Sequence, residues 1–117
     1  MNIGRLGEQQ AAAFFARGGY KILARNYRTR YGEIDLICAD AQYVVFVEVK
    51  ARTGDRFGAP REAVTHAKQQ KIIRTAQQWL MEHPTDRQPR FDVAEVWVSP
   101  ASYACRVVHI ADAFEVF

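Results

Sequence analysis

Apolar and polar positions recur along the chain with two different periods, and each period marks a type of element. Spacings of three and four residues among small and apolar side chains predict a first helix over residues 4–18 and a second helix from Pro60 to Glu82. Runs rich in β-branched and aromatic residues predict strands over residues 20–28, 33–38, 43–50, 90–98 and 104–110. The order α-β-β-β-α-β-β indicates one α/β domain over residues 1–117, with a mixed central sheet flanked by helices.

The strands over 33–38 and 43–50 are joined by a short polar segment, which favours an antiparallel hairpin. If the loop has two residues, Asp35 lies opposite Glu48 and Glu33 lies opposite Lys50, with all four side chains on one face. The other face is expected to be wholly apolar and to consist of Ile34, Leu36, Cys38, Val45, Val47 and Val49. A hairpin that is apolar on both faces is expected in the middle of a sheet covered on both sides.

The opposed carboxylates of Asp35 and Glu48 suggest a metal site. Like charges destabilise a strand pair, and burial adds a cost of several kcal/mol unless a cation neutralises them. Two hard oxygen ligands with room for water and phosphate suit Mg²⁺ or Mn²⁺, and Lys50 points into the same space. The same pattern also fits a solvated hairpin end, where Lys50 would form a surface salt bridge worth under about 1 kcal/mol.

Basic residues lie on several segments around this hairpin. The sequence has 16 Lys and Arg against 13 Asp and Glu, a net charge of +3, which favours polyanionic partners. Arg28 and Arg30 suit phosphate contacts, although an edge strand also carries such residues against aggregation. Arg52 and Arg56 fall in a loop predicted over residues 51–60. Lys68, Lys71 and Arg74 form a basic ridge on the second helix, either a solvated face or a DNA-facing one.

Other polar residues have a more ordinary interpretation. Cys38 and Cys105 are expected to be free thiols, and no signal peptide or membrane span is visible, so a cytoplasmic protein is expected. The three histidines lack paired ligand spacing and are interpreted as packing or surface residues. Asp92 is expected to neutralise a neighbouring arginine. Glu8 either reaches the acidic end of the hairpin or favours the start of the first helix through its dipole.

Several blocks of the sequence resemble the bacterial YraN family. They are Gly7-Glu8, Asn26-Tyr27-Arg28, Gly32 to Ile37, Phe46 to Arg52, Phe57-Gly58, Lys68-Gln69 and Arg90 to Val93. That family is similar to archaeal Holliday junction resolvases and belongs to the restriction-endonuclease-like, PD-(D/E)xK nuclease superfamily. One departure is Ile34, which stands where the proline of the superfamily motif would be.

The resemblance implies a restriction-endonuclease-like fold and a Mg²⁺-dependent or Mn²⁺-dependent DNA endonuclease. Asp35 and Glu48 would be metal ligands, with the Val49 carbonyl as a third. Lys50 would orient or deprotonate the attacking water, or stabilise phosphorane charge, and Glu8 resembles the first-helix carboxylate of the resolvases. The phosphate-binding residues would be Arg28, Arg30, Arg52, Arg56, Lys68 and Lys71.

Branched or structured DNA is the candidate substrate, and cleavage at branches requires two sites at a fixed separation, so a homodimer is expected. The alternative is a nucleic-acid-binding or accessory protein of DNA processing that has the same fold and no catalytic activity.

Overall fold

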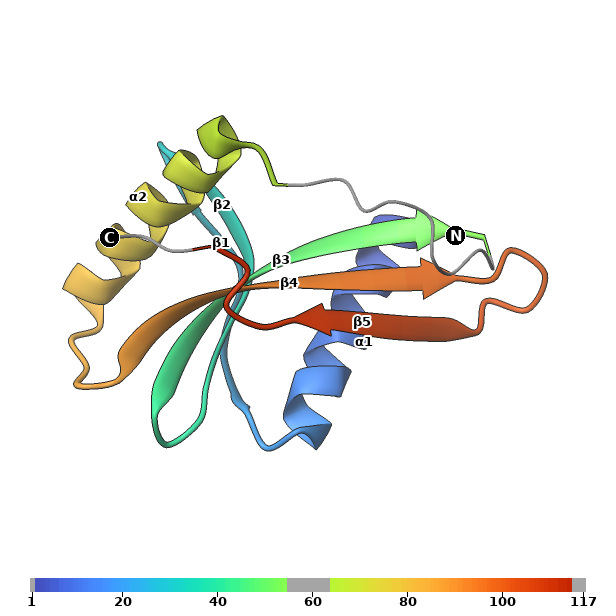
Figure 1. Cartoon of the computed structure of the whole chain (residues 1–117), viewed down its shortest axis with the longest axis horizontal. Helices are drawn as coiled ribbons and strands as arrows, with labels where there is room; N and C mark the ends of the chain where they lie inside the picture. The colour runs from blue at the N-terminus through green and yellow to red at the C-terminus, as the bar shows by residue number, and fades with distance from the viewer. Residues whose placement is uncertain (1, 55–63, 115–117) are drawn as a thin grey trace.

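The computed structural model describes residues 2–54 and 64–114 of the chain, and these form the predicted order of elements (Figure 1). The elements are α1 (Ile3–Arg17), β1 (Lys21–Thr29), β2 (Gly32–Ala39), β3 (Tyr43–Thr53), α2 (His66–Glu82), β4 (Gln88–Val98) and β5 (Cys105–Ile110). The α/β prediction is therefore confirmed.

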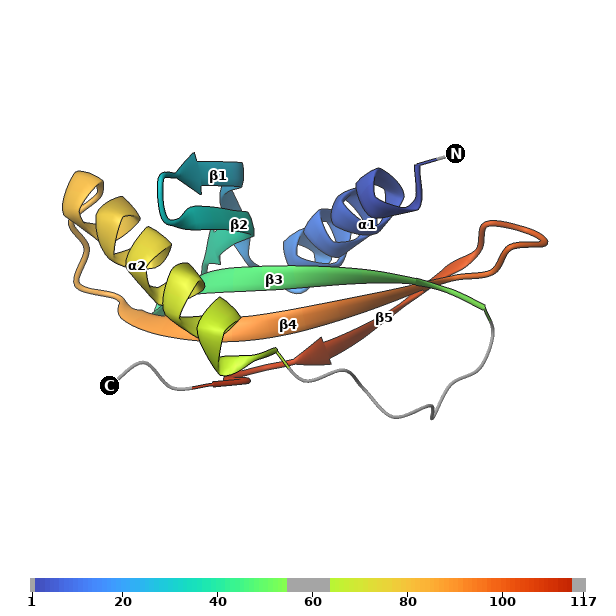
Figure 2. The same ribbon diagram turned by 90° about the horizontal axis from the view of Figure 1, so that it is seen from above.

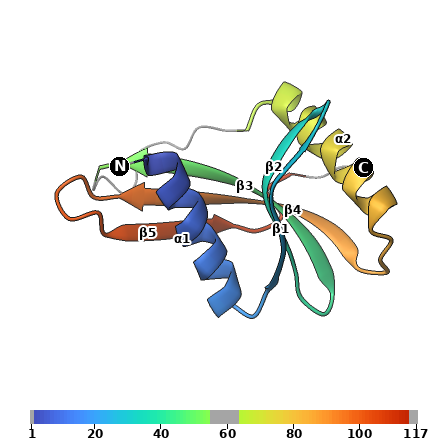
Figure 3. The same cartoon turned by 180° about the vertical axis from the view of Figure 1, so that it is seen from behind.

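The strands of the described residues form one five-stranded sheet in the order β1-β2-β3-β4-β5. β3 and β4 are parallel, whereas the other neighbours are antiparallel, so the predicted mixed sheet is confirmed. A parallel pair needs a crossover, and the segment that contains α2 provides it. Figures 2 and 3 show α1 on one face of the sheet and α2 on the other. The hairpin of β2 and β3 thus has a helix on each side.

The core on the α1 side is built from the predicted apolar stripe. Ala11 and Phe15 are fully buried and pack with alternate residues of β2, β3 and β4. Gly7 allows the close approach of helix and sheet, because a Cβ at this position would lie 2.9 Å from the Cβ of Ala51. The helix ends at Gly18, as predicted, and Gly19 has a left-handed φ of 93°.

The core on the α2 side contains the predicted stripe of the second helix, with Ile72, Ile73 and Trp79 packed around Phe46. The expected start of this helix, Pro60, lies outside the described residues. Within them the helix begins at His66, because the Thr65 side chain accepts a hydrogen bond from the Lys68 backbone N–H at 3.2 Å. Ala67, in this first turn, is exposed.

Two predictions about the sheet are wrong in detail. A loop was expected from Ala51, but β3 continues to Thr53 because it stays paired with β4 up to Val98. Ile34 was expected on the same face as Leu36 and Cys38, which pack against α1, yet it packs in the core on the α2 side. The pairing of β2 with β3 stops at Leu36, beyond which β2 bends away together with β1 (Figure 1).

Two further expectations concern the thiols and the membrane. Cys38 is buried, Cys105 is partly buried, and both are free, as predicted. Burial raises the pKa of the Cys38 thiol to about 12. No helix within the described residues has the length and apolar composition needed to cross a bilayer.

Candidate active site

The hairpin has the register that brings the two predicted acids to adjacent positions. Ala39 pairs with Val44 and Leu36 pairs with Val47, so Asp35 and Glu48 are the next residues outward on the two strands. The turn is fixed by Asp40, whose Oδ1 accepts hydrogen bonds from the backbone N–H of Gln42 at 2.9 Å and of Tyr43 at 2.7 Å. The expected two-residue loop is therefore present.

Beyond the last paired residues, Leu36 and Val47, the Asp35 side chain takes the place of a backbone acceptor on β2. The Val49 N–H donates to Asp35 Oδ2 at 2.8 Å. In an extended strand the N–H and C=O of one residue point to the same side, so the Val49 carbonyl also faces β2. The structure thus brings together the three groups expected to bind a metal, namely the Asp35 and Glu48 carboxylates and the Val49 carbonyl.

A small cavity of about 160 Å³ lies between these acids and α2. Its lining consists of Gly32, Glu33, Asp35, Glu48, Lys68, Lys71 and Ile72. The Glu48 side chain is only 8% exposed, and its Oε1 lies 2.7 Å from Lys68 Nζ. A buried carboxylate needs such a counter-charge, and α2 supplies it. The basic ridge of α2, which consists of Lys68, Lys71 and Arg74, therefore starts beside Asp35 and Glu48.

The carboxyl group of Asp35 is a weaker acid than an ordinary aspartate. Burial, followed by the negative charge of Glu48, raises its pKa to about 7, while the hydrogen bond from Val49 opposes this rise and the charges of Glu8 and Glu33 add to it. An acid of this kind is half protonated near neutral pH. When Asp35 is ionised, a bound cation would compensate for its burial and for the repulsion between its charge and that of Glu48.

Asn26 links two further acids at the edge of this site. With its amide nitrogen turned toward the carboxylates, Asn26 donates to Glu8 Oε1 and to Glu33 Oε1, each at 3.1 Å. The residue has a left-handed φ of 53°, which asparagine tolerates better than most residues do. Glu8 therefore does reach the acidic end of the hairpin. The role of Asn26 was missed, because a strand pattern does not reveal a left-handed residue within it.

Contrary to the prediction, Glu33 and Lys50 do not lie opposite each other. Glu33 was expected opposite Lys50, but the ladder ends before that position and Glu33 pairs with Arg28, whose Nε lies 3.3 Å from Glu33 Oε1. Lys50 is half-buried, is the register partner of Glu95 on β4, and is absent from the described lining of the cavity. In its place, Lys68 contacts Glu48.

Of the remaining residues predicted to contact phosphate, the structure describes Arg30 and Arg52. Arg30 is exposed in the turn between β1 and β2, and Arg52 is half-buried in β3. Arg56 lies outside the described residues. Among the described residues no three His, Cys, Asp or Glu side chains form a group that could hold a metal ion, so a metal here would rely on two carboxylates, a carbonyl and water.

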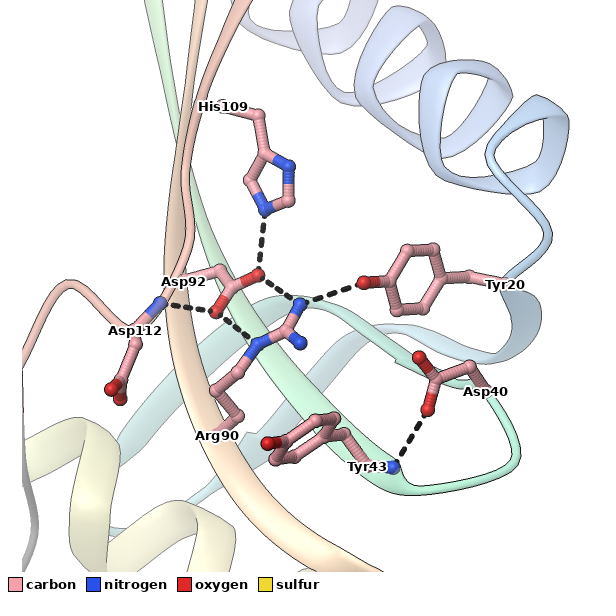
Figure 4. Close-up of polar contacts among 7 residues, drawn as sticks. All are labelled: Tyr20, Asp40, Tyr43, Arg90, Asp92, His109 and Asp112. Atoms are coloured by element: carbon pink, nitrogen blue, oxygen red, sulfur yellow. Dashed lines mark hydrogen bonds and ion pairs between the residues drawn. The ribbon is translucent and has the colours of Figure 1, made fainter.

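A second polar cluster surrounds Asp92, which is fully buried (Figure 4). Its carboxylate accepts hydrogen bonds from Arg90 Nε at 2.9 Å and from the Asp112 N–H at 2.9 Å, and it lies 2.6 Å from His109 Nε2. Arg90 also donates to the Tyr20 hydroxyl at 2.8 Å. The expected neutralisation of Asp92 by an arginine is confirmed. The contact with His109 was missed, because the two residues lie on different strands.

Burial alone would raise the pKa of Asp92, but its hydrogen bonds with His109, Arg90 and the Asp112 N–H hold this pKa below its usual value. Both carboxylate oxygens are engaged within the protein. We therefore assign this cluster to the stability of the fold, and the acids beside α2 remain the candidate site.

Comparison with known proteins places the chain among bacterial relatives of similar length. A family model described as "Uncharacterised protein family UPF0102" matches residues 7–96. The UPF0102 protein of Symbiobacterium thermophilum is 49% identical over 111 residues, covering 93% of this chain and 94% of that protein. The one from Caldanaerobacter subterraneus subsp. tengcongensis is 45% identical over 114 residues, covering 96% and 93%. The one from Nocardia farcinica is 52% identical over 99 residues, covering 84% and 78%. The chain therefore belongs to the UPF0102 family.

Proposed function

We propose that this protein is a metal-dependent endonuclease that hydrolyses DNA phosphodiester bonds, with branched or structured DNA as its substrate. The observation that carries the proposal is the placement of Asp35 and Glu48 on adjacent strands, in one cavity lined by the basic residues Lys68 and Lys71. The resemblance to the YraN family, and through it to the restriction-endonuclease-like resolvases, supports the same reaction.

The residues present fit a bound Mg²⁺ or Mn²⁺. Such ions are commonly held by one or two carboxylates together with waters and substrate phosphates, and Asp35, Glu48 and the Val49 carbonyl offer this set of oxygens. A bound ion of this kind polarises a phosphoryl oxygen and lowers the pKa of a coordinated water. It would also relieve the repulsion between the two acids.

We assign roles to the other residues from their positions and, for Lys50 and Arg56, from the resemblance to the YraN family. Lys68 holds the Glu48 carboxylate in place from α2. Lys50, two residues beyond Glu48 on β3, orients or deprotonates the attacking water or stabilises charge on the phosphorane. Neighbouring phosphates are held by basic side chains, namely Lys71, Arg28, Arg30, Arg52 and Arg56. Glu8 acts through Asn26 and Glu33 as a positioning residue for the acidic end of the hairpin.

The test is a cleavage assay on supercoiled plasmid, single-stranded DNA and a four-way junction, each with Mg²⁺, with Mn²⁺ and with EDTA. We expect metal-dependent cleavage that falls at least about 100-fold in Asp35→Asn and in Lys50→Ala. Asp86→Asn, an exposed acid in the segment between α2 and β4, serves as the control and should cleave normally. If folded protein leaves all three DNAs intact with either metal, the proposal is wrong.

The second candidate is a nucleic-acid-binding accessory protein without catalysis. It is favoured by one contact, the Lys68 ammonium on Glu48, which already supplies the positive charge that a metal would bring. Titration with Mn²⁺, followed by calorimetry, separates the two proposals. A nuclease should bind the ion and lose this binding in Asp35→Asn, whereas the accessory protein should bind DNA without binding Mn²⁺.

A further inference from the structure

We infer that the surface beside the acidic cavity holds an unpaired base of a nucleic acid. The surface is a groove of about 480 Å³ lined by Tyr31, Arg74, Gln77, Gln78 and Met81, and we call it the Tyr31 groove. The inference rests on the proposed function for the class of ligand and adds to it the structure that the ligand must have.

The groove directly adjoins the proposed active site. Tyr31 precedes Gly32, which lines the acidic cavity, and Arg74 lies one helical turn beyond Lys71, which lines it too. Three residues along a helix correspond to about 4.5 Å. A strand with a phosphate at the acids would therefore pass along α2 into the groove.

The side chains of the groove suit a flat, unpaired ligand. The Arg30 guanidinium lies 4.9 Å from the centre of the Tyr31 ring and that of Arg74 lies 6.0 Å from it. Arg30 also donates a hydrogen bond to the Tyr31 hydroxyl at 2.8 Å, which holds the ring. Aromatic rings and guanidinium planes both stack on bases, so these side chains offer flat surfaces for a base. Met81, which is 82% exposed, adds a polarisable apolar surface.

The charges around the groove set the direction of the strand. Arg74 lines the groove on the turn of α2 next to Lys71, which lines the acidic cavity, so a phosphate would be attracted to this end. At the other end Gln78 donates to Glu82, whose carboxylate also accepts from the Tyr27 hydroxyl at 2.6 Å. This negative charge repels phosphate, so the backbone lies near Arg74 and the base lies toward Met81.

A base within a duplex is stacked and paired and cannot enter such a groove. The ligand must therefore have an unpaired nucleotide next to the phosphodiester held at Asp35, as in a single strand, a gap or a branch point. Stacking uses the face of the base and does not depend on the sugar, so the experiment includes both DNA and RNA.

The test measures binding without cleavage. Asp35→Asn protein in EDTA is titrated with oligonucleotides that contain 2-aminopurine, a fluorescent base, in an unpaired position or in a duplex. We expect quenching of the unpaired probe on binding. In Asp35→Asn protein that also has Tyr31→Leu, we expect a loss of affinity for this probe of about 5- to 150-fold, the range of one stacked base, with duplex affinity unchanged.

Two variants control for other effects. Tyr31→Phe keeps the ring and should retain both quenching and affinity. Tyr103→Leu replaces a tyrosine that is 49% exposed in the turn between β4 and β5, at the end of the molecule away from α2 (Figure 1), and should behave like the parent. The inference is wrong if Tyr31→Leu binds the unpaired probe normally or loses duplex affinity equally. Quenching without any cleavage by wild-type protein would reject the nuclease and retain the groove.

Discussion

At the scale of single residues, Asp35 lies where an ionised acid is costly. Its folded pKa of about 7 exceeds the ordinary value of 3.8 that applies to the unfolded chain. The folded state therefore binds the proton more tightly, and the free energy of unfolding falls as the pH rises from about 4 to about 7. Besides burial, the groups that shift this pKa are Glu48, the Val49 N–H, Glu8 and Glu33, and Lys68 and Lys71 line the same cavity.

In metal-free protein, Asp35→Asn should therefore be stabilising at pH 8, by on the order of a few kcal/mol, because each unit of pKa corresponds to about 1.4 kcal/mol. At pH 4 the variant and the wild type should be nearly equal. Urea denaturation in EDTA at the two pH values measures this difference. A difference that is the same at both pH values would contradict it.

The addition of Mg²⁺ should stabilise the wild type more than Asp35→Asn, since a ligand that binds only the folded state raises its stability.

The pair of acids could be predicted from sequence, because alternation and a short polar turn fix the register of a hairpin. The contact of Lys68 with Glu48 could not, since it depends on how α2 lies against the sheet. The sequence pattern correctly placed Lys68 and Lys71 on one ridge, yet it gave Lys50 the place beside the acids. A long side chain on a neighbouring helix competes for such a position and leaves no signal in strand periodicity.

At the scale of elements, the Asp92 cluster joins β4 to β5 and, through Tyr20, to the segment between α1 and β1. Its folded pKa is lowered, so the stability it contributes is present above the ordinary value of 3.8 and is lost as the pH falls below it. Figure 4 shows the side chains that converge on this carboxylate.

Asp92→Asn should destabilise the fold by about 3–5 kcal/mol, because it leaves the Arg90 guanidinium without its buried partner. Thermal and urea denaturation near pH 7 measure the loss. Asp86→Asn, on the surface, should change stability by less than about 0.5 kcal/mol. Equal stabilities of the two variants would show that the cluster is not structural.

The helices and strands themselves were largely predictable, since periods of 3.6 and 2 follow from burial on one face. Their ends were less so. The start of α2 depends on the Thr65 cap, and the length of β3 depends on pairing with β4, which is remote in sequence. The side on which Ile34 packs depends on the bend of β2, and a strict alternation cannot represent a bend.

At the scale of the whole molecule, the basic ridge on α2 is expected to govern affinity for nucleic acid. Phosphate contacts release counterions, so the logarithm of the binding constant should fall linearly with the logarithm of salt concentration. Lys68→Ala with Lys71→Ala should reduce the magnitude of this slope by about one to two. Fluorescence anisotropy over a series of salt concentrations measures it.

Arg17→Ala removes an exposed charge from the last turn of α1, on the other face of the sheet, and should leave the slope unchanged (Figure 2). If both variants change the slope equally, binding follows net charge and the ridge has no special role.

The parallel pairing of β3 with β4 also bears on how the protein is synthesised. The hairpin with Asp35 and Glu48 leaves the ribosome well before Val98, the last residue that pairs with β3. Until then one edge of β3 has no neighbour, and apolar side chains of the nascent chain stay in contact with water. An open edge of this kind invites aggregation. Rapid completion of translation, or a chaperone bound to the unfinished sheet, would protect this hairpin during this interval.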